Sequence, residues 1–250
     1  MKILVATLLA LGGALGLNSL ALAQKTTPEA ALATSAEAIQ QQYTNSFVSH
    51  PQLYNGPEYV DYSRRYHTRT GHQFFLTPER QPGNVYYNDL HFTAVPLAYD
   101  VVRDQVVLKH PTSPLTLHLI NENVRSFTLN DHRFVRLVAD SASRRVLRTG
   151  YYEVLAEGRV QVLAKRAKRQ QEKINQNYVD VEFISIDRLY LQRAGRYYAI
   201  SRKGAAMRLF ADKAPEMQKF IRDRQLKFSS TYFEASLVEL ARHYNMLTAQ

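Results

Sequence analysis

The chain has 250 residues, of which 45% are hydrophobic and 22% are charged, a balance that excludes a fibrous or wholly disordered protein. It contains no cysteine, which excludes disulfides, thiol nucleophiles, thiolate zinc sites and a lipid carried on an N-terminal cysteine. Its formal net charge is +10 at pH 7, and the excess lies in residues 99–250, which hold 26 basic and 16 acidic residues.

Arginine outnumbers lysine by 22 to 10 in this sequence. Guanidinium forks match the geometry of phosphate and carboxylate groups better than ammonium groups do. The composition therefore favours an anionic partner. The alternative is a basic domain that is soluble and rich in arginine without using that charge, because net charge argues for association and not for a particular function.

Residues 1–23 have the organisation of a cleavable secretory signal peptide. Lys2 supplies the positive start, residues 3–22 carry no charge, and Ala21 and Ala23 stand at the cleavage positions. Glycine and polar residues interrupt the apolar run before it reaches the ~20 residues that a membrane-spanning helix needs. We expect export to the periplasm or the extracellular space, with a mature chain that begins at Gln24 and has no transmembrane segment.

The mature chain divides into a polar start and a β-rich remainder. Residues 24–50 are rich in Ala and Gln and offer few large apolar side chains, which indicates a tether or a marginal helix. Residues 51–250 are long enough for a sizeable core without disulfides. We expect them to form a single β-rich domain.

An aromatic and arginine-rich segment opens this domain. It contains five candidate interface residues, Tyr54, Tyr59, Tyr62, Arg64 and Arg65. Tyrosine and arginine are favoured where proteins bind carbohydrates, peptides or other proteins. The same residues also suit a segment that wraps around its own sheet, and the sequence leaves both interpretations open.

From residue 72 onward, short aromatic and β-branched runs alternate with turn signals, which is typical of strands. Two-residue turns at Glu157-Gly158 and Ala194-Gly195 predict antiparallel neighbours. The predicted strands cover residues 72–76, 84–87, 90–98, 99–103, 105–110, 115–120, 124–129, 133–138, 151–156, 159–164, 181–186, 188–192 and 196–201. We expect their core to include Leu117, Leu119, Val154, Val162, Phe183, Ile186 and Tyr198.

After Phe210 the apolar period changes from two residues to about 3.6, which predicts helices over 215–226 and 232–247. An amphipathic membrane-surface role is the alternative for the second helix, although Glu234 and Glu239 lie among its polar positions. The expected fold is thus mainly β, an antiparallel β-sandwich or curled β-meander with two C-terminal helices.

Recognised catalytic signatures are missing from the sequence. It has no nucleophile elbow, no zinc-protease helix motif, no phosphate-binding loop and no dinucleotide loop. Among eight histidines, only His91, two residues after Asp89, resembles a polar pair on one strand face, and a chance occurrence is the simpler explanation. His118 is expected to be a solvated strand residue. We therefore assign no catalytic residue, no metal ligand and no cofactor.

The densest basic run supplies four candidate anion-binding residues, Lys165, Arg166, Lys168 and Arg169. Because unpaired buried charge is costly, we expect all four to face water or a partner. Export argues against nucleic acid, which leaves anionic lipid headgroups, an acidic glycan or an envelope protein as partners. A solvated loop is the alternative.

Several short motifs extend across most of the mature chain, and their succession resembles uncharacterised exported proteins of Bacteroidetes-type bacteria. The resemblance implies an exported single-domain protein and carries no activity. The motifs are Tyr54-Asn-Gly-x-Glu58-Tyr59, Gly71-x-x-Phe74-Phe75, Leu97-x-Tyr99-Asp100 with Val106-Val-Leu108, Gly150-Tyr-Tyr-Glu-Val-Leu155, and Ala164-Lys165-Arg166.

The sequence therefore predicts an exported, non-catalytic envelope or extracellular module that binds an anionic or glycan-bearing partner. The alternative is a secreted hydrolase with an unrecognised active site. The two differ in geometry, because a hydrolase needs His, Asp or Glu side chains that converge in a cleft.

Overall fold

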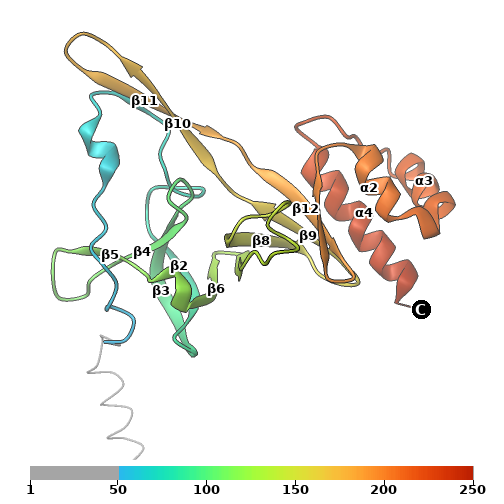
Figure 1. The fold of residues 1–250 in the computed structure, drawn as a ribbon, viewed down its shortest axis with the longest axis horizontal. Helices are drawn as coiled ribbons and strands as arrows, with labels where there is room; N and C mark the ends of the chain where they lie inside the picture. Colours follow the sequence, from blue (N-terminus) through green and yellow to red (C-terminus); the bar gives the residue numbers. More distant parts are fainter. Residues whose placement is uncertain (1–50, 250) are drawn as a thin grey trace, which may run out of the picture. The chain divides into compact units, whose positions relative to one another are not determined.

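Strands dominate the computed structural model, which describes residues 51–249, and the mainly β prediction is confirmed (Figure 1). The predicted signal peptide over 1–23, the start of the mature chain at Gln24 and the tether over 24–50 lie outside the described residues. Residues 51–249 belong to one compact unit.

Ten strands form one antiparallel sheet in the order β13-β12-β9-β8-β7-β6-β2-β3-β4-β5. Most neighbours in this order are consecutive along the chain, which is the arrangement of a meander. The strands are β2 (Gln81–Tyr87), β3 (Leu90–Asp100), β4 (Gln105–Lys109), β5 (Thr116–His118), β6 (Val124–Leu129), β7 (His132–Leu137), β8 (Gly150–Ala156), β9 (Val160–Lys165), β12 (Arg188–Arg193) and β13 (Arg196–Ile200).

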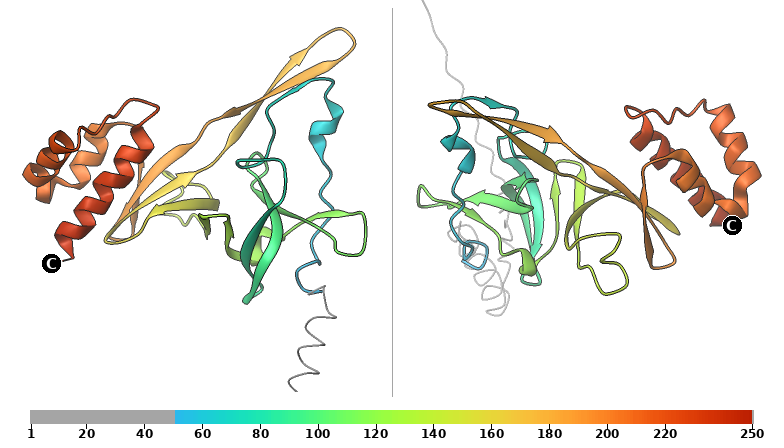
Figure 2. Two further views of the ribbon diagram at one scale, coloured as in Figure 1. Left: turned by 180° about the vertical axis from the view of Figure 1, so that it is seen from behind. Right: turned by 45° about the horizontal axis from the view of Figure 1, so that its top comes forward.

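A second sheet of three strands has the order β1-β11-β10, with β1 at Arg69–Thr70, β10 at Lys168–Ile174 and β11 at Val179–Ser185. β10 pairs antiparallel with β11, whereas β1 pairs with β11 in parallel. Since β9 leads into β10 and β11 leads into β12, the four strands form one long hairpin that belongs to both sheets (Figures 1 and 2). Residues 166–167 and 186–187 mark the junction between its two halves.

Three α-helices follow β13: α2 (Lys203–Leu209), α3 (Ala214–Asp223) and α4 (Phe233–Thr248). The two predicted C-terminal helices correspond to α3 and α4. Leu237, Leu240 and Tyr244 of α4 are fully buried in one cluster with Val160 and Val162 of β9. None of the helices within residues 51–249 has the length and apolar character needed to cross a bilayer. Single 3₁₀ turns lie at η1 (Tyr62–Arg65), η2 (Asn121–Asn123) and η3 (Ala211–Lys213).

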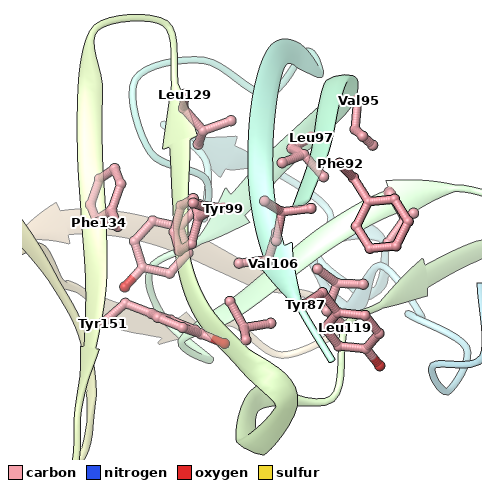
Figure 3. Close-up of a cluster of buried hydrophobic side chains, with 14 of the residues drawn as sticks. Tyr87, Phe92, Val95, Leu97, Tyr99, Val106, Leu119, Leu129, Phe134 and Tyr151 are labelled. Carbon is pink, nitrogen blue, oxygen red and sulfur yellow. The ribbon is translucent and has the colours of Figure 1, made fainter. Parts of the chain in front are cut away.

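Aromatic rings fill the core between β3, β6, β7 and β8 (Figure 3). Phe127 and Phe134 are stacked with centroids 4.7 Å apart. Tyr99 meets both rings edge to face, and Tyr151 meets Phe127 edge to face. Such pairs contribute about 0.5–1.5 kcal/mol beyond the burial of their area. This cluster packs the four strands together, and the same strands carry polar side chains of the sites described below.

Six of the seven predicted core residues are buried or half-buried. Leu117, Leu119, Val162 and Phe183 are buried, and Val154 and Tyr198 are half-buried against neighbouring clusters. Ile186 is 40% exposed, so its placement in the core is wrong. It lies at the junction of the hairpin, directly after β11, where the regular alternation of the strand ends.

The strand prediction is wrong in several details, and it also lacks the short β1. Residues 72–76 form only a single bridge, between Phe74 and Asp100. The predicted strand over 99–103 is the end of β3 followed by a turn. β10 was missed because its sequence, Lys-Arg-Gln-Gln-Glu-Lys-Ile, is almost entirely polar and has no apolar alternation.

The structure places the predicted Asp89–His91 pair and the predicted solvated His118 in different surroundings. Asp89 and His91 are both exposed, and Asp89 lies 3.6 Å from the Arg125 guanidinium. His118 is half-buried on β5, and its Nδ1 lies 3.1 Å from the Leu119 carbonyl oxygen. Among residues 51–249 no group of three or more acidic or histidine side chains is placed to hold a metal ion.

Candidate anion-binding pocket

The basic run that the sequence singled out is divided between opposite faces of the long hairpin. Successive strand residues point to opposite sides, so Lys165 and Arg166 diverge at the end of β9. Lys165 borders a pocket with Arg188, whereas Arg166 and Lys168 border a different pocket with Asp187. The run is therefore not one continuous basic surface.

Arg166 is enclosed by three carboxylates from three elements. Its Nε donates to Glu153 of β8 at 2.5 Å, and its terminal nitrogens donate to Asp187 at 2.9 Å and to Glu234 of α4 at 2.7 and 2.8 Å. The Arg166 side chain is only 13% exposed and that of Glu153 only 4%. The expectation that Arg166 faces solvent is wrong, because its charge is used inside the fold.

Lys165 is also paired internally. Its Nζ donates to Asp104 Oδ1 at 2.7 Å and to the Tyr151 carbonyl at 3.1 Å. Desolvation lowers the pKa of Lys165, while the Asp104 carboxylate acts in the opposite direction. Gly150 allows this pair to form, since a Cβ at that position would lie 2.0 Å from Asp104 Oδ2.

The other two residues of the run have different surroundings. Lys168 donates to the carbonyl oxygens of His72 and Phe74, at 2.8 and 2.7 Å, and is half-buried. Arg169 is exposed and lies 3.3 Å from the amide oxygen of Gln171. Of the four candidates, only Arg169 has the solvent exposure that the sequence predicted, and anion binding by this group stays a prediction.

The candidate interface residues also separate. Tyr59 and Tyr62 are buried and donate their hydroxyl groups to Asp100, at 2.8 and 3.2 Å, so they are not a free surface. Their segment wraps around its own sheet, which was the alternative interpretation. Burial raises the pKa of Asp100, and hydrogen bonds from the backbone and from the two tyrosines act against this rise.

The remaining members of that set lie at the margin of the same segment. Tyr54 is half-buried beside His110, with ring centroids 5.5 Å apart. Arg64 is exposed and lies 3.5 Å from Asp61, and Arg65 donates to Glu172 at 3.0 Å. These arginines have carboxylate partners, so the segment offers no concentrated positive charge.

A pocket of about 400 Å³ on the other face of the hairpin is lined by arginines that were not among the predicted site residues. Arg144, Arg145 and Arg148 come from the connection between β7 and β8, and Arg188 comes from the start of β12. We call these four residues the arginine pocket. The remaining lining residues are Val146, Leu147, Tyr152, Lys165, Ala167, Ile186 and Tyr190.

The charge of the arginine pocket is not neutralised within the described part of the chain. No acidic residue lines it, and no described carboxylate lies within 4.0 Å of the four guanidinium groups. All four arginines are exposed. Lys165 adds little, because Asp104 compensates its charge.

Buried groups hold the arginine-bearing loop in place. Leu147 is 2% exposed and packs with Tyr152, Leu163 and Tyr190. The Tyr152 hydroxyl donates to the Arg148 carbonyl at 2.8 Å and accepts from the Arg148 N–H at 3.1 Å. Earlier in the loop, Asp140 accepts from Ser143 N at 2.7 Å and closes the turn before Arg144.

Tyr152 is a neutral part of the pocket wall. Burial raises the pKa of Tyr152 to about 12. Its ring meets that of Tyr190 edge to face, with centroids 5.5 Å apart. The pocket thus combines four exposed arginines with a buried floor formed by Leu147, Tyr152 and Tyr190.

A second pocket, of about 350 Å³, lies on the Arg166 side of the hairpin. His132 borders it, and its Nδ1 is hydrogen-bonded to the buried Glu153 carboxylate. Because a carboxylate accepts, this bond places the proton on Nδ1 and leaves Nε2 as the basic nitrogen. Such a pair has the geometry of an oriented general base.

Searches against protein-family models, curated proteins and solved structures found no match to this chain. The resemblance to exported proteins of Bacteroidetes-type bacteria accordingly stays a prediction. The fold and the site define a β-rich protein with an arginine-lined pocket, and the function is argued from that geometry.

Proposed function

We propose that this protein is an exported, non-catalytic envelope or extracellular module that binds an anionic partner through the arginine pocket. The single observation that carries the proposal is a set of four exposed arginines around one pocket, without a described carboxylate in reach. Export to the periplasm or the extracellular space rests on the sequence of residues 1–23.

Positive charges gathered at one pocket raise the local concentration of anions and favour an anionic ligand. The anchored backbone of Leu147 and Arg148 holds part of the charge in place before binding, so less conformational entropy is lost. Anionic lipid headgroups, acidic glycans and acidic envelope proteins all present the required charge. Exposed charges are screened over ~8 Å at physiological ionic strength, so this binding is salt-sensitive.

The test replaces Arg144, Arg145, Arg148 and Arg188 with Gln and measures binding to heparin and to vesicles that contain phosphatidylglycerol. Each basic residue near an anionic surface contributes about 1 kcal/mol, so the quadruple variant should bind roughly two to three orders of magnitude more weakly. The parent protein should lose affinity steadily as salt is added.

A matched control removes the same charge elsewhere. Arg196 on β13, Arg202 directly before α2, and Lys219 and Arg222 on α3 are exposed and lie outside the pocket. Changing these four to Gln should reduce binding far less than the pocket variant does. Equal losses in the two variants, or no binding by the parent at low salt, would contradict the proposal.

The His132–Glu153 pair favours a second candidate function, a secreted hydrolase. In that reaction His132 Nε2 would take a proton from water while the water oxygen adds to an ester carbonyl in the 350 Å³ pocket. The bond between the carbonyl carbon and the ester oxygen would then break, and the protonated His132 would return its proton to the departing alcohol or phenol oxygen. A positioned base contributes about 10²–10⁴ in rate. Hydrolysis of 4-nitrophenyl acetate should fall by that factor in His132→Ala and stay unchanged in His91→Ala. Equal rates in all three proteins would exclude this candidate.

A further inference from the structure

We propose that the arginine pocket binds a phosphate monoester whose organic part is apolar, an inference that rests on the proposed anion-binding function and narrows it to one ligand class. Two independent features of the pocket support it. The first is the amount of unneutralised charge, and the second is a pair of exposed aliphatic side chains at the same rim.

The charge favours a dianion over a monoanion. Four arginines line one pocket of about 400 Å³ with no acidic lining residue. A carboxylate offers two oxygens and one negative charge, whereas a phosphate monoester offers three oxygens and a charge of about −1.5 to −2 at pH 7. Guanidinium forks bind phosphate oxygens in pairs, so a phosphate engages more of the four arginines at once.

Val146 and Ile186 give the pocket an apolar rim. They are 38% and 40% exposed, and both line this pocket. Val146 lies in the arginine loop and Ile186 lies at the junction of the hairpin, so the two come from different segments. A purely ionic ligand leaves them in water, whereas an alkyl group next to the phosphate covers them.

The pocket has room for a phosphate and a short apolar extension. Its volume lies within the ~300–1,000 Å³ of small-molecule sites. Ala167 and the edge of Tyr190 continue the apolar lining from Ile186. The ligand class is therefore an amphiphilic phosphate, either a soluble ester or the headgroup of a lipid such as phosphatidic acid.

The experiment compares three soluble probes by isothermal titration calorimetry at low salt: inorganic phosphate, hexyl phosphate and hexanoate. Each buried methylene adds about 0.8 kcal/mol, or about fourfold in affinity, so contact with two or three methylenes should make hexyl phosphate bind at least tenfold more tightly than inorganic phosphate. Hexanoate has a similar chain and a single charge, and should bind more weakly than hexyl phosphate by about tenfold or more.

A rim variant, Val146→Ser with Ile186→Ser, isolates the apolar contribution. Both side chains are exposed, so the fold should be retained. The variant should lose the preference for hexyl phosphate and keep the affinity for inorganic phosphate. Vesicles of phosphatidylcholine with phosphatidic acid distinguish the source: competition of hexyl phosphate against these vesicles places the lipid headgroup in the same pocket, and failure to compete limits the ligand to the soluble ester.

The outcomes separate this inference from the proposed function. Binding to heparin that depends on the four arginines, together with equal affinities for inorganic and hexyl phosphate, would overturn the ligand class and leave anion binding intact. An unchanged preference for hexyl phosphate over inorganic phosphate in the rim variant would also overturn the ligand class. No binding of any anion by the parent would overturn both proposals.

Discussion

Arg166→Gln is expected to lower the free energy of unfolding by about 3–5 kcal/mol, the usual cost of removing one partner from a buried ion pair. The loss arises mainly at Glu153, which is 4% exposed and would lose the guanidinium that pairs with it. Asp187 and Glu234 are 35% and 38% exposed, so water screens their contributions. Urea unfolding followed by circular dichroism measures the change.

Arg169→Gln is the matched control, since Arg169 lies three residues away and is exposed. It should change the free energy of unfolding by less than about 0.5 kcal/mol. A small effect of Arg166→Gln, equal to that of Arg169→Gln, would show that Glu153 does not depend on the guanidinium. The comparison of the two variants also shows whether the charge of Arg166 is neutralised inside the fold or belongs to a basic run that faces solvent.

Phe134→Ala should destabilise the protein by about 3–5 kcal/mol, because truncation of a large buried aromatic leaves a cavity that the surroundings fill only in part. Phe134 is fully buried, stacks on Phe127 and meets Phe75 edge to face. It also meets Tyr99 edge to face (Figure 3). Thermal or urea unfolding of the purified variant measures the loss.

Val138→Ala serves as the control for this core substitution. Val138 follows β7 directly and is 65% exposed, so its truncation should cost less than about 0.5 kcal/mol. Similar losses for the two variants would contradict the placement of Phe134 at the centre of the aromatic cluster.

Alternation in the sequence located most of the sheet, because the strands concerned have one buried face. In β2, Gly83, Val85 and Tyr87 are buried and the residues between them are not, which is the pattern the prediction relies on. β10 has no such face and was missed. The short helix α2 contains Gly204 and two alanines, and it gave no apolar stripe that could distinguish it from a loop.

Only part of the candidate site could be predicted, because a sequence shows which residues are charged but not which residues they pair with. Glu153 and Glu234 are 13 and 68 residues from Arg166, so the pairing that buries this arginine leaves no local signal. The arginine pocket joins residues 144–148 to Arg188 through the fold. The pattern Arg-Arg-x-x-Arg after Asp140 was visible in the sequence and was the one available clue.

Adjacent residues at the hairpin junction lie on opposite faces and have different roles. Lys165 and Arg188 border the arginine pocket, while Arg166 and Asp187 belong to the carboxylate cluster that links β8 and α4 to the hairpin. Selection for a new ligand can therefore act on alternate positions of one strand without altering the positions that preserve the fold. We expect the odd and even positions of this segment to vary at different rates among homologous chains. Insertion of a single residue here would turn the pocket-lining residues toward the carboxylate cluster and the cluster residues toward the pocket.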